Sequence, residues 1–284
     1  MRIAFFTATM GGAGHLVHAL AVERGLRRQG FEGVFRVVGP EVPYPVEHGL
    51  DYVVGTVPRA AFRAAEAALA TAAARELLAF DPDVLLVDMF WAPLTHVLPA
   101  LRGEAWLLLH TVPRSWLRGP LKNRFQPELF ARVLATEPMR HHPELDAIPP
   151  VVVCNPDEQQ PVMALKQHLG VPLDQHLTLV AQTGMPGELE RLAEQAKEQG
   201  SVVCSLSLRQ PGALFPLAPY LCGADRILGG AGYNLWWETR WLGLSDRTHC
   251  VAFDRTIDDQ AFRASSGLIP QENGADVLAR MLVP

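Results

Sequence analysis

The chain has 284 residues, of which 49% are hydrophobic and 19% charged, and its formal net charge is −5. A folded chain of this length buries roughly 75% of the surface that its unfolded form exposes, so neither disulfides nor a structural metal are needed to hold it together. The 30 acidic residues outnumber the 25 basic ones, which argues against a non-specific nucleic-acid binder. We therefore expect one large or two modest domains and no nucleic-acid partner.

The cysteines and the apolar runs indicate the cellular compartment in which the protein is expected. The four cysteines are widely spaced without a Cys-x-x-Cys pair, so a zinc ribbon or a disulfide framework loses support. No uncharged apolar run approaches the roughly 18 residues of a membrane span. The apolar run 3–6 follows Arg2 as in a signal peptide, but it soon breaks into a glycine cluster and indicates a first strand. These features predict a cytoplasmic protein.

Short apolar runs alternate with helical patterns over the first 110 residues. Strands are expected over residues 3–8, 34–38, 84–87 and 106–109. Helices are expected over residues 16–26 (with a stop at Gly30), 59–79 and 92–101. Strands that alternate with helices indicate right-handed βαβ units and a parallel sheet that is covered on both faces.

The alternation stops in the proline-rich stretch 111–150 and restarts after an expected last strand at 151–156. In the second half, strands are expected over residues 177–182, 201–206, 226–228 and 249–253, and helices over residues 188–199, 234–242 and 274–282. This pattern predicts two α/β domains, residues 1–156 and 157–284. Ligands of open α/β sheets bind outside the carboxyl ends of the strands, so a cleft between the two domains is the expected site.

A glycine-rich turn, Gly11-Gly12-Ala13-Gly14-His15, joins the first strand to the first helix. Glycines there let the backbone come close to a ligand, and a helix N-terminus attracts anions. The turn matches neither the dinucleotide fingerprint nor the Walker A loop. His15 is a candidate general base, the alternative being a helix cap, whereas His18 is expected to be structural.

A second turn, Gly229 to Asn234, opens the expected helix 234–242. The tryptophans of that helix are expected to pack in the core. Glu238 lies one turn into the helix, where a carboxylate suits a ribose diol because it accepts hydrogen bonds from both hydroxyls. Asp258-Asp259-Gln260 precedes another helix, so these acids are either ligand-binding groups or charges favoured at a helix start.

Taken together, these pieces resemble the GT-B fold glycosyltransferases of the type (family 28) that includes the lipid II-forming N-acetylglucosaminyltransferase and the diacylglycerol glycosyltransferases. The resemblance rests on motifs in a fixed order along nearly the whole chain. These motifs are Gly11-Gly12-Ala13-Gly14-His15, Asp81-Pro82-Asp83-Val84, Cys154-Asn155-Pro156, Gly229 to Leu244 with Glu238 in register, and Asp259-Gln260.

The resemblance implies two Rossmann-like parallel-sheet domains that face each other across a cleft. The N-terminal domain would lie on the acceptor side, and the C-terminal domain would hold a nucleotide-sugar donor, expected to be a UDP-sugar. His15 would deprotonate the acceptor hydroxyl or stabilise the leaving diphosphate. The donor-binding residues implied are Gly12, Gly14 and Gly184 of the glycine turns, Gly232 and Asn234 at the diphosphate, Glu238 at the ribose, and Asp259 and Gln260 at the sugar.

The resemblance further implies no cofactor and no metal, because helix dipoles and backbone N–H groups supply the charge stabilisation. The chain departs from the family at Arg263, where the donor motif has Asn. Its end soon after the helix at 274–282 leaves open whether a C-terminal helix crosses back onto the first domain.

Three functions remain open on the sequence. The first is an inverting transfer of a sugar to an unknown hydroxyl acceptor. The second is a nucleotide-sugar hydrolase similar to the compact hydrolase of pseudaminic acid biosynthesis, whose glycine-histidine loop resembles residues 12–15, and the third is a non-catalytic nucleotide-sugar-binding protein. A basic stretch is expected either to contact an acidic acceptor or a membrane surface, or to be a solvated loop; its residues are Arg114, Arg118, Lys122 and Arg124.

Overall fold

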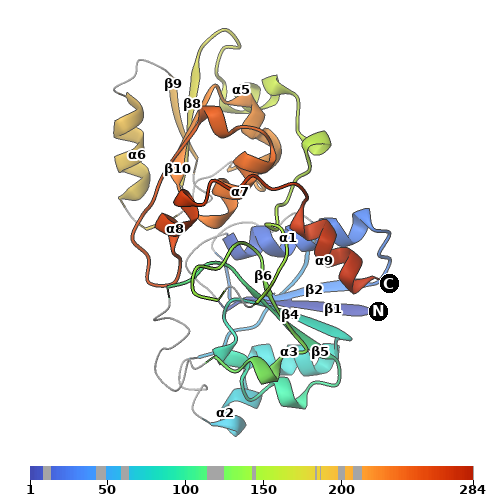
Figure 1. Ribbon diagram of the computed structural model, residues 1–284. Helices are drawn as coiled ribbons and strands as arrows, with labels where there is room; N and C mark the ends of the chain where they lie inside the picture. The colour runs from blue at the N-terminus through green and yellow to red at the C-terminus, as the bar shows by residue number, and fades with distance from the viewer. Residues whose placement is uncertain are drawn as a thin grey trace.

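The chain folds into two lobes, with helices α1 and α9 side by side at their junction (Figure 1). The computed structural model describes residues 1–8, 14–42, 49–58, 64–113, 125–142, 145–182, 184–185, 187–197, 202–206 and 213–283. Gly12 and the basic stretch Arg114, Arg118, Lys122 and Arg124 lie outside these described residues.

The first lobe is built on a parallel sheet with the strand order β3-β2-β1-β4-β5-β6-β7. Its strands are β1 (Arg2–Phe6), β2 (Val34–Gly39), β3 (Asp51–Val54), β4 (Val84–Asp88), β5 (Glu104–Leu109), β6 (Arg132–Ala135) and β7 (Asp146–Ala147). Its helices are α1 (Gly14–Arg28), α2 (Ala65–Leu69) and α3 (Ala72–Phe80), with 3₁₀ turns η2 (Ala92–Leu94), η3 (Leu98–Ala100) and η5 (Pro127–Leu129).

Strand β1 explains why the first apolar run is continuous. Ile3 and Phe5 are buried in the core that contains residues of α1, whereas Ala4 and Phe6 are buried in the core that contains residues of α3. A strand covered on both faces has no polar side, so its sequence cannot alternate.

The second lobe is built on a smaller parallel sheet with the order β11-β10-β8-β9. Its strands are β8 (Leu177–Ala181), β9 (Val202–Leu206), β10 (Arg226–Gly230) and β11 (Thr248–Val251). Its helices are α5 (Val162–Leu169), α6 (Glu188–Lys197), α7 (Tyr233–Trp241) and α8 (Gln260–Ser265), with 3₁₀ turns η6 (Pro156–Glu158), η7 (Ala218–Gly223) and η8 (Ser245–Arg247). The two sheets lie in separate halves of the chain, while the domain boundary at residue 156 stays a prediction.

Helix α9 (Gly274–Leu282) returns to the first lobe and packs against α1, which answers the question that the chain length left open. A Cβ atom on Gly25 would lie 2.5 Å from the backbone oxygen of Ala275, so the two helices approach as closely as their backbones allow. Arg28 adds an ion pair to Asp276 at 2.7 Å.

The sequence prediction differs from the structure in several segments. The expected helix 59–79 is broken over its described part into α2 and α3, because Thr71 caps the start of α3, and helix α5 was not predicted. Residues 92–101 form two 3₁₀ turns instead of a helix, each with a proline at its start. Residues 151–156 are not a strand, because side chains from the second lobe satisfy their backbone: the Val151 N–H donates to Tyr233 and the Val152 N–H to Asn273. The short strands β3, β6 and β7 were missed.

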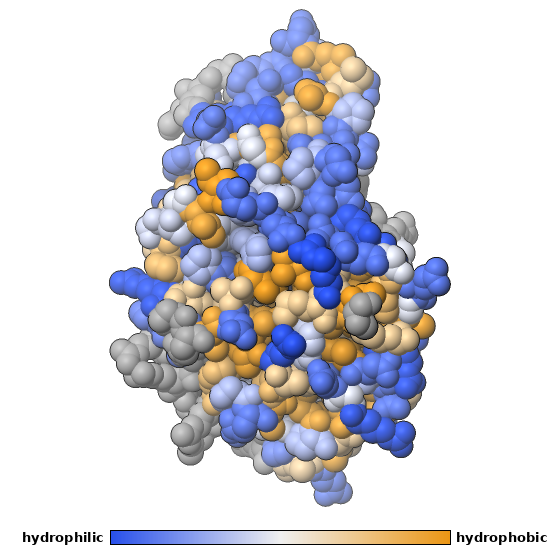
Figure 2. Space-filling view, turned by 45° about the vertical axis from the view of Figure 1, so that its right-hand side comes forward, coloured by the Kyte–Doolittle hydropathy of each residue, from blue (hydrophilic) through white to orange (hydrophobic). Residues whose placement is uncertain are grey.

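Among the described helices, none is long and apolar enough to cross a membrane. On the face drawn in Figure 2, hydrophilic residues cover most of the upper lobe, and hydrophobic residues gather toward the middle and the lower lobe.

We expect Gly25→Ala to destabilise the protein by about 1–3 kcal/mol, because the added methyl group overpacks the contact between α1 and α9. Denaturant unfolding measures the change. Glu23→Ala on the same helix is the control, and its free energy of unfolding should stay within about 0.5 kcal/mol of the wild type. Equal stability of Gly25→Ala and the control would contradict the close packing of the two helices.

Candidate functional site

A cleft of about 460 Å³ lies where the carboxyl ends of the two sheets face each other. Residues of both lobes line it. The first lobe contributes Gly14, His15, Val17, His18 and His110, and the second contributes, among others, Gln182, Gly184, Leu214, Gly232, Asn234, Leu235, Glu238, Arg255, Asp258 and Gln260.

His15 and Asp88 form a short polar contact on the first-lobe side. Asp88 ends strand β4, which neighbours β1, so its carboxylate reaches the start of helix α1. The His15 Nδ1 lies 2.6 Å from the Asp88 Oδ2. Burial alone would raise the pKa of Asp88, but the His15 and His18 imidazoles hold it well below its usual range. An ionised carboxylate only accepts, so the His15 Nδ1–H is the donor; in the neutral imidazole the Nε2 then keeps a lone pair that can accept a proton.

Two further features mark the surroundings of Asp88. The His18 Nδ1 lies 3.4 Å from its other oxygen, and the His18 ring packs edge-on against Tyr233 at 4.4 Å. The next residue, Met89, has a φ of 63°, which a residue with a side chain seldom adopts. Strained backbone of this kind is found at functional sites, where the surrounding structure holds it. His18 thus contacts the Asp88 that orients His15 and also lines the cleft, and its expected structural role stays a prediction.

Helix α7 begins on the opposite wall of the cleft. Its N-cap is Gly232, which has no side chain to satisfy the first N–H groups of the helix. Asn234 donates from Nδ2 to the Gly14 carbonyl at 3.0 Å, which brings the N-terminal ends of α1 and α7 together across the cleft. N–H groups that no side chain of the described residues caps, together with two helix dipoles, favour an anion at this point.

Glu238 lies one turn further along α7. Its residue is only 6% exposed, and its side chain makes no hydrogen bond or ion pair with any residue in the described part of the chain. Burial raises its pKa from the ordinary 4.5 to about 8. A buried carboxylate that lines a cleft without a partner is an acceptor available to ligand hydroxyls.

The two acids before α8 have different positions. Asp258 lines the cleft, with its oxygens accepting from Gln260 Nε2 at 3.0 Å and Arg263 at 2.6 Å. Asp259 does not line it; this side chain caps α8 by accepting from the Phe262 N–H at 3.1 Å. Gln260 lines the cleft and also accepts from the Phe253 N–H. Of the pair that the sequence singled out, only Gln260 reaches the cleft, and Asp258 stands in the place expected for Asp259.

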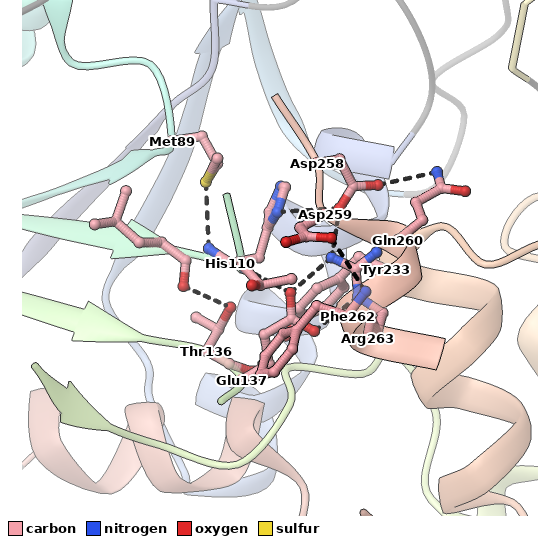
Figure 3. Close-up of polar contacts among 12 residues, drawn as sticks. Met89, His110, Thr136, Glu137, Tyr233, Asp258, Asp259, Gln260, Phe262 and Arg263 are labelled. Carbon is pink, nitrogen blue, oxygen red and sulfur yellow. Dashed lines mark hydrogen bonds and ion pairs between the residues drawn. The ribbon is translucent and has the colours of Figure 1, made fainter. Parts of the chain in front are cut away.

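His110 follows β5 and enters the cleft from the first lobe, where Figure 3 shows it beside Asp258. Burial lowers its pKa to about 4, so the imidazole is neutral at pH 7. Its Nδ1 lies 3.8 Å from the Asp258 Oδ1, beyond hydrogen-bond distance, and has no partner among the described residues.

Arg255, in the segment after β11, brings a positive charge to the cleft beside the turn that contains Gly184. Arg255 pairs with Glu188 at 2.5 Å, and the Glu188 carboxylate also accepts from Gln182 and the Met185 N–H. A Cβ atom on Gly184 would lie 2.2 Å from a carboxylate oxygen of Glu188, so a side chain there would displace this network. The Arg255 guanidinium is held in place by this network while lining the cleft.

Most of the predicted site residues meet in one cleft: Gly14, His15, Gly184, Gly232, Asn234, Glu238 and Gln260. Sequence reasoning missed Asp88, His110 and Arg255, and of the two acids that it named before α8 it favoured Asp259 over Asp258. Asp88 ends a strand, and His110 and Arg255 come after the carboxyl ends of β5 and β11, positions that signal a ligand-binding edge. Over the described ranges, no group of three His, Cys, Asp or Glu side chains could hold a metal ion.

No family model and no curated protein matches the chain. Solved structures do. Spinosyn rhamnosyltransferase SpnG has a TM-score of 0.60 at 17% identity, over 99% of this chain and 92% of that chain. A variant of Os79 from O. sativa in complex with UDP has a TM-score of 0.58 at 13% identity, over 99% and 91% of the two chains. Phytolacca americana UGT2, complexed with UDP-2fluoro-glucose and pterostilbene, has a TM-score of 0.52 at 14% identity, over 99% of this chain and 90% of that chain.

These structures cover almost the whole chain but differ widely from it in sequence, so the likeness concerns the fold. Two parallel Rossmann-like sheets that face each other across a cleft form the GT-B architecture, which confirms the fold class predicted from the sequence.

The raised pKa of Glu238 predicts how the free energy of unfolding changes with pH. Between pH 4.5 and about 8 the unfolded carboxyl is ionised while the folded one holds its proton, so this residue lowers stability as pH rises through that window. Glu238→Gln removes the effect, because the amide stays neutral.

Urea unfolding at pH 5 and pH 8.5 tests this. We expect the free energy of unfolding of Glu238→Gln, measured relative to that of the wild type, to be larger at pH 8.5 than at pH 5. The exposed Glu194→Gln, whose side chain is 70% exposed, should show the same difference at both values of pH. A difference independent of pH for Glu238→Gln would contradict the prediction.

Proposed function

We propose that the protein is a glycosyltransferase that moves a sugar from a nucleoside-diphosphate donor to a hydroxyl acceptor. One observation carries the proposal: the His15–Asp88 pair and the uncapped N-terminus of α7 face the same cleft from opposite lobes. The first supplies a base and the second an anion site. Solved structures of the same fold whose names call them rhamnosyl- and forosaminyltransferases, one of them complexed with thymidine diphosphate, support it.

In this proposal the donor lies along the second lobe. The diphosphate accepts hydrogen bonds from the first N–H groups of α7, at Gly232 and Asn234, and pairs with Arg255. The ribose hydroxyls donate to Glu238, one helical turn further on, which ionises when it gains these donors. Apolar side chains such as Leu214 and Leu235 line the same cleft and suit the flat faces of a base.

The transferred sugar then lies between the lobes, near Asp258, Gln260 and His110. His15 accepts the proton of the acceptor hydroxyl at Nε2, while the hydroxyl oxygen forms its bond to the anomeric carbon. The bond from that carbon to the diphosphate breaks, and its electron pair stays on the leaving diphosphate. Attack opposite the leaving group inverts the anomeric configuration. The negative Asp88 carboxylate stabilises the imidazolium that forms.

The charge of the leaving diphosphate is met by the helix N-terminus and Arg255, so we propose a reaction that needs no metal ion and no further cofactor. UDP is the expected nucleotide, with thymidine diphosphate as the tested alternative. The relation to the lipid II and diacylglycerol glycosyltransferases, the acceptor, and contact with a membrane stay part of the proposal.

Nucleotide binding tests the donor site. At a free concentration about 100 times its dissociation constant, a nucleoside diphosphate should stabilise the protein by roughly 2.7 kcal/mol, visible as a rise in Tm. Glu238→Ala and Arg255→Ala should each reduce the rise, whereas the exposed Arg75→Ala on α3 should keep it. No rise with UDP, thymidine diphosphate, GDP or ADP would overturn the proposed donor site.

His15→Ala and Asp88→Asn test the base. Each should lower kcat on the order of 10²–10⁴-fold, because the first removes the proton acceptor and the second its orientation. Nucleotide affinity should stay unchanged in both. Release of free sugar without any acceptor, lost in His15→Ala, would favour the hydrolase. Nucleotide binding without turnover in the wild type would favour the non-catalytic binding protein.

A further inference from the structure

Arg263 is a positive charge buried at the base of the cleft. Its side chain has no exposed surface, and it touches three different parts of the molecule. It donates to both oxygens of Glu137 at 2.6 and 2.7 Å, to Asp258 at 2.6 Å, and to the Ala231 carbonyl at 2.9 Å (Figure 3). Ala231 belongs to the turn that opens α7, so one guanidinium holds the donor-side turn and the cleft-side Asp258 together.

Glu137 is the partner from the other lobe. It follows β6 of the first sheet and is only 1% exposed. Besides Arg263 it accepts from the Thr111 N–H at 2.7 Å in its own lobe and from the Trp237 Nε1 at 2.6 Å in α7. All four donors to its carboxylate are short and buried, and three of them come from the second lobe.

Burying these charges is costly unless geometry and hydrogen bonding are complete, and a replacement by apolar side chains would often be as stable. Stability alone therefore does not account for an ion network between two lobes. The position of the network gives a reason for it. On one side the network contacts Asp258 and the turn before α7, and on the other side it contacts the end of β5 next to His110. An error of about 1 Å between reacting groups can cost on the order of 10²-fold in rate.

We propose that the Glu137–Arg263 pair is an interlobe lock that fixes the donor-binding turn and Asp258 relative to the first lobe, and hence relative to His15. Arg263 is a positioning residue, since it lines no part of the cleft itself. The lock holds the lobes in register before any donor binds. Its catalytic consequence rests on the proposed function, whereas the lock itself does not.

Glu137→Gln tests the lock, because it keeps the side-chain size but loses the charge that the guanidinium fork requires. In the protein without ligand, we expect faster amide hydrogen exchange in residues 231–237 and in α8, and a larger radius of gyration in small-angle scattering. Arg28→Ala is the matched control: it breaks the ion pairs of Arg28 with Glu158 and Asp276 at the other interlobe contact. It should leave exchange in residues 231–237 and in α8 unchanged. Unchanged exchange and scattering in Glu137→Gln would overturn the lock, whatever the activity.

Measurements of kcat and nucleotide affinity give the second test of the lock. Glu137→Gln should bind nucleoside diphosphate within about 3-fold of the wild type, because every group that we place against the nucleotide remains, and should lose at least 10-fold in kcat. Arg28→Ala should keep its kcat.

If Glu137→Gln unfolds, the apolar double variant Glu137→Leu with Arg263→Met restores packing without charge and should show the same loss of kcat. A folded double variant with wild-type exchange and kcat would refute the positioning role. Failure of the wild type to bind any nucleotide would overturn the proposed function, and the exchange experiment would still decide the lock.

Discussion

Both sheets are parallel, and this constraint decides where the polar chemistry of the protein can lie. In a parallel sheet all strands end at the same edge, and helices cover the two faces, so only that edge is open to a ligand. Here Asp88 ends β4, His110 and Glu137 closely follow β5 and β6, and Asp258 lies in the segment between β11 and α8. Because the carboxyl edges of the two sheets face each other, side chains far apart in the sequence meet in one cleft.

The buried carboxylates of this cleft differ in how their charge is balanced. Asp88 lies between two histidines, and Glu137 and Asp258 share Arg263. Glu238 alone among these four has no partner within the described chain, and burial raises its pKa to about 8. A buried carboxyl group whose pKa is raised this far, and which the protein itself leaves without a hydrogen-bond partner, is typical of a functional site. The position of Glu238 one turn behind an uncapped helix N-terminus makes ligand hydroxyls the natural donors.

The contacts between the lobes fall into two kinds. At the outer side α9 packs on α1 through small residues and an Arg28–Asp276 pair, which joins the end of the chain to its beginning. At the cleft side the contacts are polar and directional: Asn234 to Gly14, Tyr233 to the Thr136 carbonyl, and Arg263 to Glu137. Short hydrogen bonds require particular distances and angles between donor and acceptor. The polar contacts therefore set the relative position of the groups that line the cleft.

The sequence by itself determined the fold class, most of the long elements, and the glycine turns with His15, Gly232, Asn234 and Glu238, because continuous apolar runs and glycine turns are local signals. It did not determine the partner of His15, since the distance from residue 15 to Asp88 is bridged only by the pairing of β1 with β4. Nor did it separate Asp258 from Asp259, which differ in whether the side chain caps α8 or faces the cleft. In the sequence, Arg263 was only a departure from the donor motif. Its role as an ion-pair partner is seen only in the structure, where it contacts Glu137, 126 residues away. Local pattern determines which elements form, but the packing of one sheet edge against another decides which side chains meet.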